Sequence, residues 1–226
     1  MILQESLKEK GDSSICVCLL DENKNRTLCV FPSTVRELTI DEVLGKVGLD
    51  WTFDTKFLHL TSMVGDTSFE TQKYVVKNTP SHVKISFDPG MLYAERGLDA
   101  LLPIIEKSYV IFANDKEIER ITGKNYERGV KELLKYSEIV ACKLGEEGSK
   151  VFYNDKEIYT PITKVEVVDT TGAGDVYDAG FLAGLLLNKS LNECAQLATE
   201  AASLSITDYG RKRYPDSTLL RRYGWA

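Results

Sequence analysis

The residues with the clearest chemical potential are Gly172, Ala173, Gly174 and Asp175, which lie between an apolar run and a predicted helix. Glycines in such a turn let the backbone approach a ligand closely, and the first amides of a helix have no partner within it. Together with the helix dipole, these amides form an anion site suited to a transferring phosphoryl group. A carboxylate at Asp175 can accept the proton of a hydroxyl that attacks phosphorus. The segment therefore predicts phosphoryl transfer to a hydroxyl, with Asp175 as the base.

The same turn also has a purely structural interpretation. Gly172 and Gly174 can be turn residues, and Thr170, Thr171 and Asp175 are residue types that often cap helices. On Gly-Ala-Gly-Asp alone, the two interpretations are about evenly balanced. The longer stretch over 165–181 is more specific, because it predicts a strand, a tight turn and a helix in immediate succession.

The elements that position this turn alternate along the chain. Apolar runs indicate strands at 56–60, 83–88, 109–113 and 139–144, followed by a hairpin over 149–154 and 157–160 and a strand at 165–168. Amphipathic stretches indicate helices at 67–76, 98–106, 114–135 (broken near Gly123), 173–187 and 191–207. The alternation predicts an α/β fold with a mostly parallel sheet and helices on both faces. Asp88, Asn114 and Asp169 follow predicted strands, where ligands bind in such sheets.

The N-terminal part predicts a helix over the first ten residues, then a β-hairpin of 14–20 and 26–31 with a turn-rich joint. Both hairpin faces are apolar, because Ile15, Val17 and Leu19 alternate with Cys16, Cys18 and Leu20. Either the hairpin packs into the main core, or a second subunit covers one face in a homodimer.

Composition restricts the classes of partner and compartment. The chain has 226 residues and a formal net charge of -6, which gives no general attraction to nucleic acid or acidic membranes. Its five cysteines form no CxxC pair and no Cys/His spacing suited to zinc. Their odd number and the lack of a secretory signal favour a cytoplasmic location.

The stretch Asp169-Thr-Thr-Gly-Ala-Gly-Asp175, followed by Asp178-Ala-Gly-Phe181, resembles the C-terminal signature of the ribokinase-like (PfkB-type) carbohydrate kinases. The resemblance implies a three-layer α/β/α fold with a mostly parallel central sheet and a small β lid. It also implies that Asp175 is the catalytic base and that Gly172, Ala173 and Gly174 form the anion hole. Asp169 and Thr171 match positions that the resemblance associates with a monovalent cation, K⁺, beside the nucleotide.

Two further motifs fit this family. Asn114 and Glu117 match its Asn-x-x-Glu motif, which implies binding near Mg²⁺ and the ATP triphosphate. Asn followed by Glu at the third position is also the pattern of a helix capping box. Lys143, Gly145 and Gly148 lie in a stretch that resembles the family's Leu-Gly-x-x-Gly loop near the nucleotide, although a simple hairpin turn also explains it.

Other parts of the chain extend the resemblance over nearly its whole length. Ala202 and Ser205 correspond to the region that flanks adenine, and Asp88-Pro89 resembles the family's Asp-Pro strand end. The hairpin resembles the lid, so we expect a lid over 14–34 and an α/β nucleotide- and phosphate-binding domain over 1–13 and 35–226. Family members carry an N-terminal Gly-Gly-Asn segment that holds the sugar, and none occurs here. The resemblance thus implies an N-terminally shortened member, either a natural short form or a fragment.

Three functions follow from these observations. The first is an ATP-dependent kinase of a sugar, sugar acid or nucleoside. The second is a nucleotide-binding or regulatory protein without turnover, which the missing sugar-binding segment favours and the intact Asp175 disfavours. The third, a dinucleotide-binding oxidoreductase, is weak because no Gly-x-Gly-x-x-Gly follows an early strand.

Overall fold

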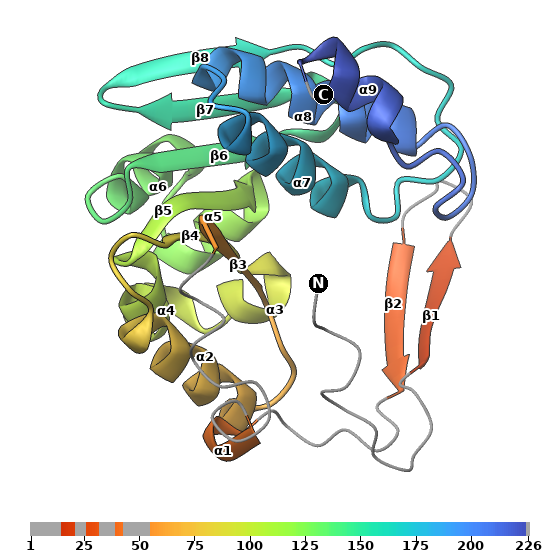
Figure 1. Cartoon of the computed structure of the whole chain (residues 1–226). Coiled ribbons are helices and arrows are strands. Elements are labelled where there is room, and N and C mark those ends of the chain that lie inside the picture. Colours follow the sequence, from red (N-terminus) through yellow and green to blue (C-terminus); the bar gives the residue numbers. More distant parts are fainter. Residues whose placement is uncertain (1–14, 21–25, 32–38, 43–54, 225–226) are drawn as a thin grey trace.

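The computed structural model describes residues 15–20, 26–31, 39–42 and 55–224 (Figure 1). These residues form a six-stranded sheet with its helices and a separate two-stranded sheet. The helix predicted over the first ten residues and the turn at 21–25 lie outside the described residues.

The strands of the six-stranded sheet lie side by side in chain order. They are β3 (Phe57–Thr61), β4 (Lys84–Asp88), β5 (Ser108–Asn114), β6 (Ile139–Lys143), β7 (Ser149–Tyr153) and β8 (Lys156–Thr160). Strands β3 to β6 run parallel, whereas β7 and β8 continue the sheet as an antiparallel hairpin. The mostly parallel sheet and its predicted C-terminal hairpin are therefore confirmed.

Helices cover both faces of this sheet. One face carries α2 (Asp66–Asn78), α3 (Gly90–Ala94), α4 (Gly97–Ile105), α5 (Asp115–Thr122) and α6 (Tyr126–Leu133). The other face carries α7 (Ala173–Leu186) and α8 (Leu191–Ser205), against which α9 (Ser217–Arg222) packs. A three-residue helix, α1 (Ile40–Glu42), precedes the sheet. The arrangement is the predicted three-layer α/β/α fold (Figure 1).

The central strand β5 shows why the sequence produces two covered faces. Val110 and Phe112 belong to the core beneath α7 and α8, whereas Ile111 and Ala113 belong to the core beneath α2 to α6. All four side chains are fully buried. Successive side chains of a strand point to opposite faces, so a strand buried on both sides is a continuous apolar run.

Close packing of α7 against α8 fixes the position of the α7 N-terminus. A Cβ at Gly180 would lie 2.8 Å from the Ala198 Cα, and one at Gly184 would lie 2.9 Å from the Cys194 Cα. Helix α8 begins with a capping box between Ser190 and Glu193. The glycines on α7 therefore let the two backbones approach, and they hold the first turn of α7 at the carboxyl ends of β4 to β6.

The strand predicted at 165–168 is wrong. Residues 161–170 form an irregular and largely exposed segment. It is held by the end of α8, since the amides of Val168 and Asp169 both donate to the Ile206 carbonyl, at 2.8 and 3.2 Å. Asp169 therefore follows no strand. The valines of this segment gave a strand pattern, but the amides of Val168 and Asp169 bond to the end of a helix.

The predicted hairpin is present as β1 (Ile15–Leu20) and β2 (Arg26–Phe31), which pair antiparallel with Leu20 opposite Arg26. It stands apart from the six-stranded sheet (Figure 1). The Val17 side chain is exposed.

Candidate functional site

The turn that begins α7 presents unpaired amides. Gly172 is the N-cap residue, in the left-handed region with φ of 80°, and no side chain caps the helix. The Ala173 amide donates to the Thr170 carbonyl at 3.3 Å, and the Val176 amide donates to the Gly172 carbonyl at 3.0 Å. In the part of the chain that the structure describes, the amides of Gly174 and Asp175 have no recorded acceptor. The helix-cap interpretation of Asp175 is therefore wrong, and the turn retains donors for an anion.

Asp175 lies in the first turn of α7 and is exposed. Asp175 is the next residue after Gly174, whose amide is unpaired. A general base must reach the proton that it removes, and an exposed carboxylate beside an anion site meets this requirement.

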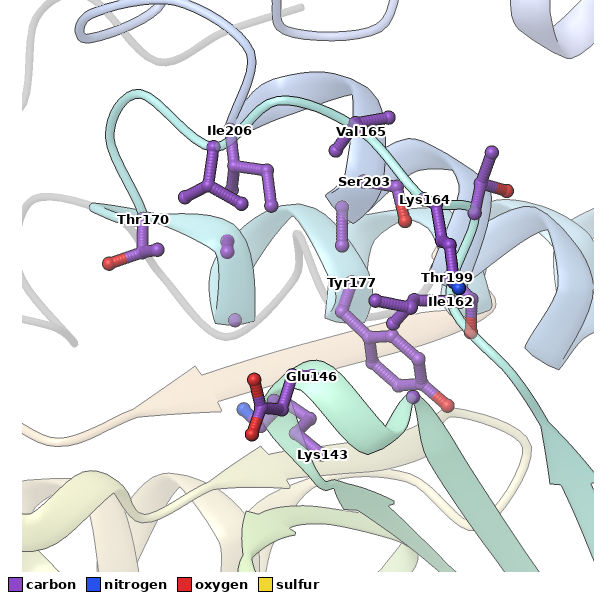
Figure 2. A pocket seen from close by; sticks show the side chains of 17 residues that line it. Lys143, Glu146, Ile162, Lys164, Val165, Thr170, Tyr177, Thr199, Ser203 and Ile206 are labelled. Carbon is purple, nitrogen blue, oxygen red and sulfur yellow. The ribbon is translucent and has the colours of Figure 1, made fainter.

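A cavity of about 580 Å³ lies on the other side of Gly174. Its walls come from the end of β6 and the following turn, the irregular 162–170 segment, the first turns of α7 and the second half of α8 (Figure 2). The predicted nucleotide-binding residues that line it are Lys143, Gly145, Gly148 and Ala202.

The remaining predicted nucleotide-binding residues, Asn114, Thr171 and Ser205, are outside the cavity lining. Ser205 is buried, and its hydroxyl donates to the Ala202 carbonyl at 2.8 Å. The neighbouring Ser203 lines the cavity instead, together with Thr199 and Ile206 on the same helix (Figure 2). Their spacing of four and three residues puts them on one helix face, and this spacing was the signal that could have identified them.

Tyr177, Thr170 and Ile162 also line the cavity and were not predicted as site residues. Tyr177 projects from α7 toward the sheet, and the 162–170 segment crosses the opposite side (Figure 2). The cavity is therefore mainly apolar, with hydroxyl groups from α7 and α8 and the Lys143 ammonium at one end.

Gly148 closes the turn between β6 and β7 for a steric reason. Its φ is 90°, and a Cβ there would lie 2.1 Å from the Thr160 carbonyl oxygen of β8. The Leu144 amide donates to the Gly148 carbonyl at 2.9 Å, which closes the turn. The simple hairpin-turn explanation is therefore sufficient for this glycine, although the turn also forms a wall of the cavity.

Asn114 and Glu117 form the capping box that begins α5. The Asn114 Oδ1 accepts from the Glu117 amide, and the Glu117 Oε2 accepts from the Asn114 amide, both at 2.8 Å. Burial raises the pKa of the Glu117 carboxyl, and the nearby Asp88 adds to the rise, while the bond from the Asn114 amide opposes it. Among the described residues, no group of three or more acidic, His or Cys side chains forms a metal cluster.

Asp169 ties its own turn to the segment after α8. One carboxylate oxygen accepts from the Thr171 amide at 2.9 Å, and the other accepts from the Gly210 amide at 3.1 Å. These two bonds hold the backbone before Gly172 against the segment that follows α8.

A group of three charged residues lies beneath the α7 turn. The Lys143 Nζ is 2.7 Å from the Asp88 Oδ2 and 3.3 Å from the Asp178 Oδ1. Their side chains are 16%, 12% and 2% exposed, in the order Lys143, Asp88 and Asp178. Burial raises the pKa of Asp178 well above its ordinary value, and Asp88 adds to the rise, although Lys143 opposes it. Burial also favours the neutral form of Asp88, but Lys143 and hydrogen bonds from Asp178 and the Gly90 amide hold the pKa of Asp88 below its ordinary value.

Sequence comparisons identify relatives of the chain. The model of the pfkB family of carbohydrate kinases matches residues 4–217. An uncharacterized sugar kinase from Archaeoglobus fulgidus is 35% identical over 210 residues, which is 91% of this chain and 81% of that protein. A nucleoside kinase from Methanocaldococcus jannaschii is 31% identical over 160 residues, which is 70% of this chain and 51% of that protein. The chain thus matches about half the length of the nucleoside kinase.

Solved structures share the fold. The adenosine kinase from Sinorhizobium meliloti superposes with a TM-score of 0.81 at 23% identity, over 93% of this chain and 65% of that one. A ribokinase from Thermotoga maritima superposes with a TM-score of 0.77 at 23% identity, over 94% of this chain and 70% of that one. At this level of identity, the likeness establishes the ribokinase-like fold alone. No helix in the described ranges is long and apolar enough to cross a membrane.

Proposed function

Since the chain belongs to the pfkB family of carbohydrate kinases, we propose that it transfers a phosphoryl group from ATP to a hydroxyl of a sugar, sugar acid or nucleoside. The observation that carries the proposal is the α7 turn, where unpaired amides of Gly174 and Asp175 adjoin an exposed carboxylate. The amides of Gly172, Ala173 and Gly174 would stabilise the charge of the transferring group, for which the Ala173 amide would have to release the Thr170 carbonyl that it meets at 3.3 Å. Asp175 would take the proton of the acceptor. The M. jannaschii relative, named a nucleoside kinase, supports nucleosides among the acceptors.

The 580 Å³ cavity is the proposed nucleotide site. Its apolar wall from α8 and the 162–170 segment suits a base, and Lys143 lies at the end nearest the α7 turn (Figure 2). The proposal assigns nucleotide contacts to Lys143, Gly145, Gly148 and Ala202. It gives Asn114, Thr171 and Ser205 indirect roles, since they are outside the lining.

Mg²⁺ would complete the proposed site by supplying positive charge that neutralises the phosphate groups. In kinases, Mg²⁺ is usually held by one or two carboxylates together with waters and substrate phosphates, so a cluster of three protein ligands is not required. Glu117 fits this role, because its Oε2 is engaged by the Asn114 amide and its Oε1 has no part in the capping box.

Glu117→Gln is expected to keep the fold and to raise the Mg²⁺ concentration needed for half-maximal turnover. Gln at this position still completes a capping box, so thermal unfolding should change little, while the metal loses an anionic ligand. A Mg²⁺ titration of turnover, beside a melting curve, checks this. An unchanged titration would mean that Glu117 serves the capping box alone.

Asp169 and Thr171 form the proposed K⁺ site beside the nucleotide. The support is the Asp169 carboxylate, which the amides of Thr171 and Gly210 orient. Oxygen ligands of this kind suit a hard cation.

The proposal is tested by two measurements on the same preparation. ATP binding is measured by calorimetry, and ADP release is measured against a panel of sugars, sugar acids and nucleosides. ADP release that rises only with one class of acceptor supports the kinase. ATP binding without acceptor-dependent release would favour the alternative of a nucleotide-binding protein without turnover.

The proposal further includes a homodimer through the β1–β2 hairpin. A two-stranded sheet is marginally stable alone in water, and β1 and β2 pair with no strand of the six-stranded sheet in the described ranges. Val17 is exposed there.

Val17→Asp is expected to shift the protein from dimer to monomer in light scattering, because it places a charge in an apolar contact. A wild-type protein that is already monomeric at high micromolar concentration would contradict the dimer.

A further inference from the structure

Lys143 brings a positive charge to the underside of the turn that begins α7. It is the last residue of β6, and its side chain extends toward α7. A Cβ built on Gly174 would lie 3.4 Å from the Lys143 Nζ. The ammonium therefore lies beside the space that a side chain at position 174 would fill, and the amide of this residue is one of the two unpaired donors of the turn.

Two carboxylates hold this ammonium in place. Asp88, at the end of β4, accepts from the Nζ at 2.7 Å, and Asp178, one turn into α7, accepts at 3.3 Å. The Gly90 amide fixes the Asp88 carboxylate by donating to its other oxygen at 3.0 Å. The Nζ also lies 3.5 Å from the Asp178 Oδ2. An ammonium has three N–H donors, so when Asp178 shares one donor between its two oxygens, one donor remains available. Lys143 is partly exposed and lines the cavity, so that donor is accessible from the nucleotide side.

The two carboxylates favour the charged form of Lys143. Burial alone would lower the pKa of Lys143, but Asp178 and Asp88 raise it above its ordinary value. Burial favours the neutral form of both carboxyl groups, and Lys143 in turn opposes this effect on their pKa. The turn above therefore lies close to a cation.

We propose that Lys143 is a catalytic residue whose ammonium donates a hydrogen bond to the transferring phosphoryl group held at Gly174, and that Asp88 and Asp178 are positioning residues that aim it. The proposal rests on the proposed function. In the step, the bond from phosphorus to ADP breaks as the bond from the acceptor oxygen to phosphorus forms. The acceptor proton passes to Asp175, and Lys143 keeps its proton throughout. The backbone amides supply only partial charges, whereas Lys143 would supply a full positive charge.

The competing explanation is structural: Lys143 would only neutralise two buried carboxylates. A set of three variants separates the explanations, namely Lys143→Met, Asp88→Asn and the double variant. Methionine keeps the length and apolar stem of lysine without the charge. Removing Lys143 alone leaves the buried Asp88 carboxylate without its cationic partner, so this variant is expected to melt at a lower temperature. In the double variant the unpaired charge is gone, and the melting temperature is expected to recover.

Turnover separates the two explanations, because a purely structural role of Lys143 would make kcat follow the melting temperature. The fall in kcat caused by Lys143→Met is measured in the wild type and again in the Asp88→Asn background. We expect a fall of about 100-fold in the wild type, the lower range for one donor to a transition-state anion, with little change in the KM for ATP. In the Asp88→Asn background we expect a smaller further fall, because that variant has already lost a group that aims the ammonium, and the kcat of the double variant stays as low as that of Lys143→Met. The proposal is overturned if the double variant recovers kcat together with stability. A rise in KM at constant kcat would also overturn it, because it would indicate simple nucleotide binding.

A second probe keeps this inference separate from the proposed function. ADP with tetrafluoroaluminate mimics the transferring group without an acceptor, so its affinity does not depend on turnover. We expect Lys143→Met to weaken this complex at least 10-fold more than it weakens ADP alone, because the lost contact is made to the transferring group. Equal losses for the two ligands would overturn the role of Lys143. A wild type that binds the mimic but phosphorylates no acceptor would contradict the proposed function alone.

Discussion

Asp175→Asn is expected to lower kcat at least about 100-fold while the fold and the affinity for ATP stay nearly unchanged, since a positioned base contributes about 10² to 10⁴ in rate. Asparagine keeps the shape of the side chain and removes only its basicity. Because Asp175 is exposed and gives no side-chain cap to α7, its replacement removes no structural contact of that kind. Steady-state kinetics and a calorimetric ATP titration measure the two quantities on one preparation.

A matched control for this variant is Asp66→Asn. Asp66 is also an exposed aspartate in the first turn of a helix, α2, and lies outside the proposed site. Both variants lose a favourable interaction with a helix dipole, and Asp66→Asn also loses a salt bridge to Arg96 at 2.8 Å. The difference in turnover between the two variants therefore reports the role of Asp175 in the reaction. Turnover of the control should equal that of the wild type. If Asp175→Asn keeps full turnover as well, the assignment of the base is wrong.

Gly172→Ala is expected to lower kcat about 100-fold, comparable to the loss of one oxyanion donor, because it deforms the turn that orients the amides. An alanine at φ of 80° is strained, and its Cβ would lie 2.2 Å from the Tyr214 hydroxyl oxygen. Either the Tyr214 side chain or the turn must move, and the amides of Gly174 and Asp175 move with the turn. Thermal unfolding and kcat are measured together.

Gly123→Ala provides the matched control for the backbone strain. Gly123 ends α5 at φ of 65°, and a Cβ there meets nothing within 4 Å. The left-handed conformation should cost this variant about 1 kcal/mol of stability, as for a single L-residue in that region, with no change in turnover. A loss of turnover in Gly172→Ala no larger than in Gly123→Ala would contradict the proposed anion hole.

Much of the fold could be predicted because its signals are local. The run that became β5 is apolar on both faces, and Gly123 breaks the pattern between α5 and α6 where the helices separate. The segment at 165–168 is rich in valine, as a strand would be, but the amide of Val168 bonds to the end of α8 and no strand forms. Helices α3 and α9 were missed because five or six residues are too few to show a helical period.

The candidate site could be predicted only where its parts are neighbours in the sequence. The α7 turn and the Asn114–Glu117 capping box each fall within four residues, so their spacing revealed them. The group of Lys143, Asp88 and Asp178 joins residues 55 and 35 positions apart, and only the tertiary fold brings them together. No local pattern indicates such a group. Ser203 was missed in favour of Ser205 because the exact face of α8 depends on how that helix packs against α7.

The most direct test of the account is the identification of a phosphorylated acceptor. The protein is incubated with ATP, Mg²⁺ and the acceptor that stimulates ADP release, and the products are quantified by phosphorus NMR. The account predicts one phosphate ester on an acceptor hydroxyl for each ADP formed, and the loss of both products with Asp175→Asn. ADP formed together with inorganic phosphate, and no ester at any acceptor, would contradict it.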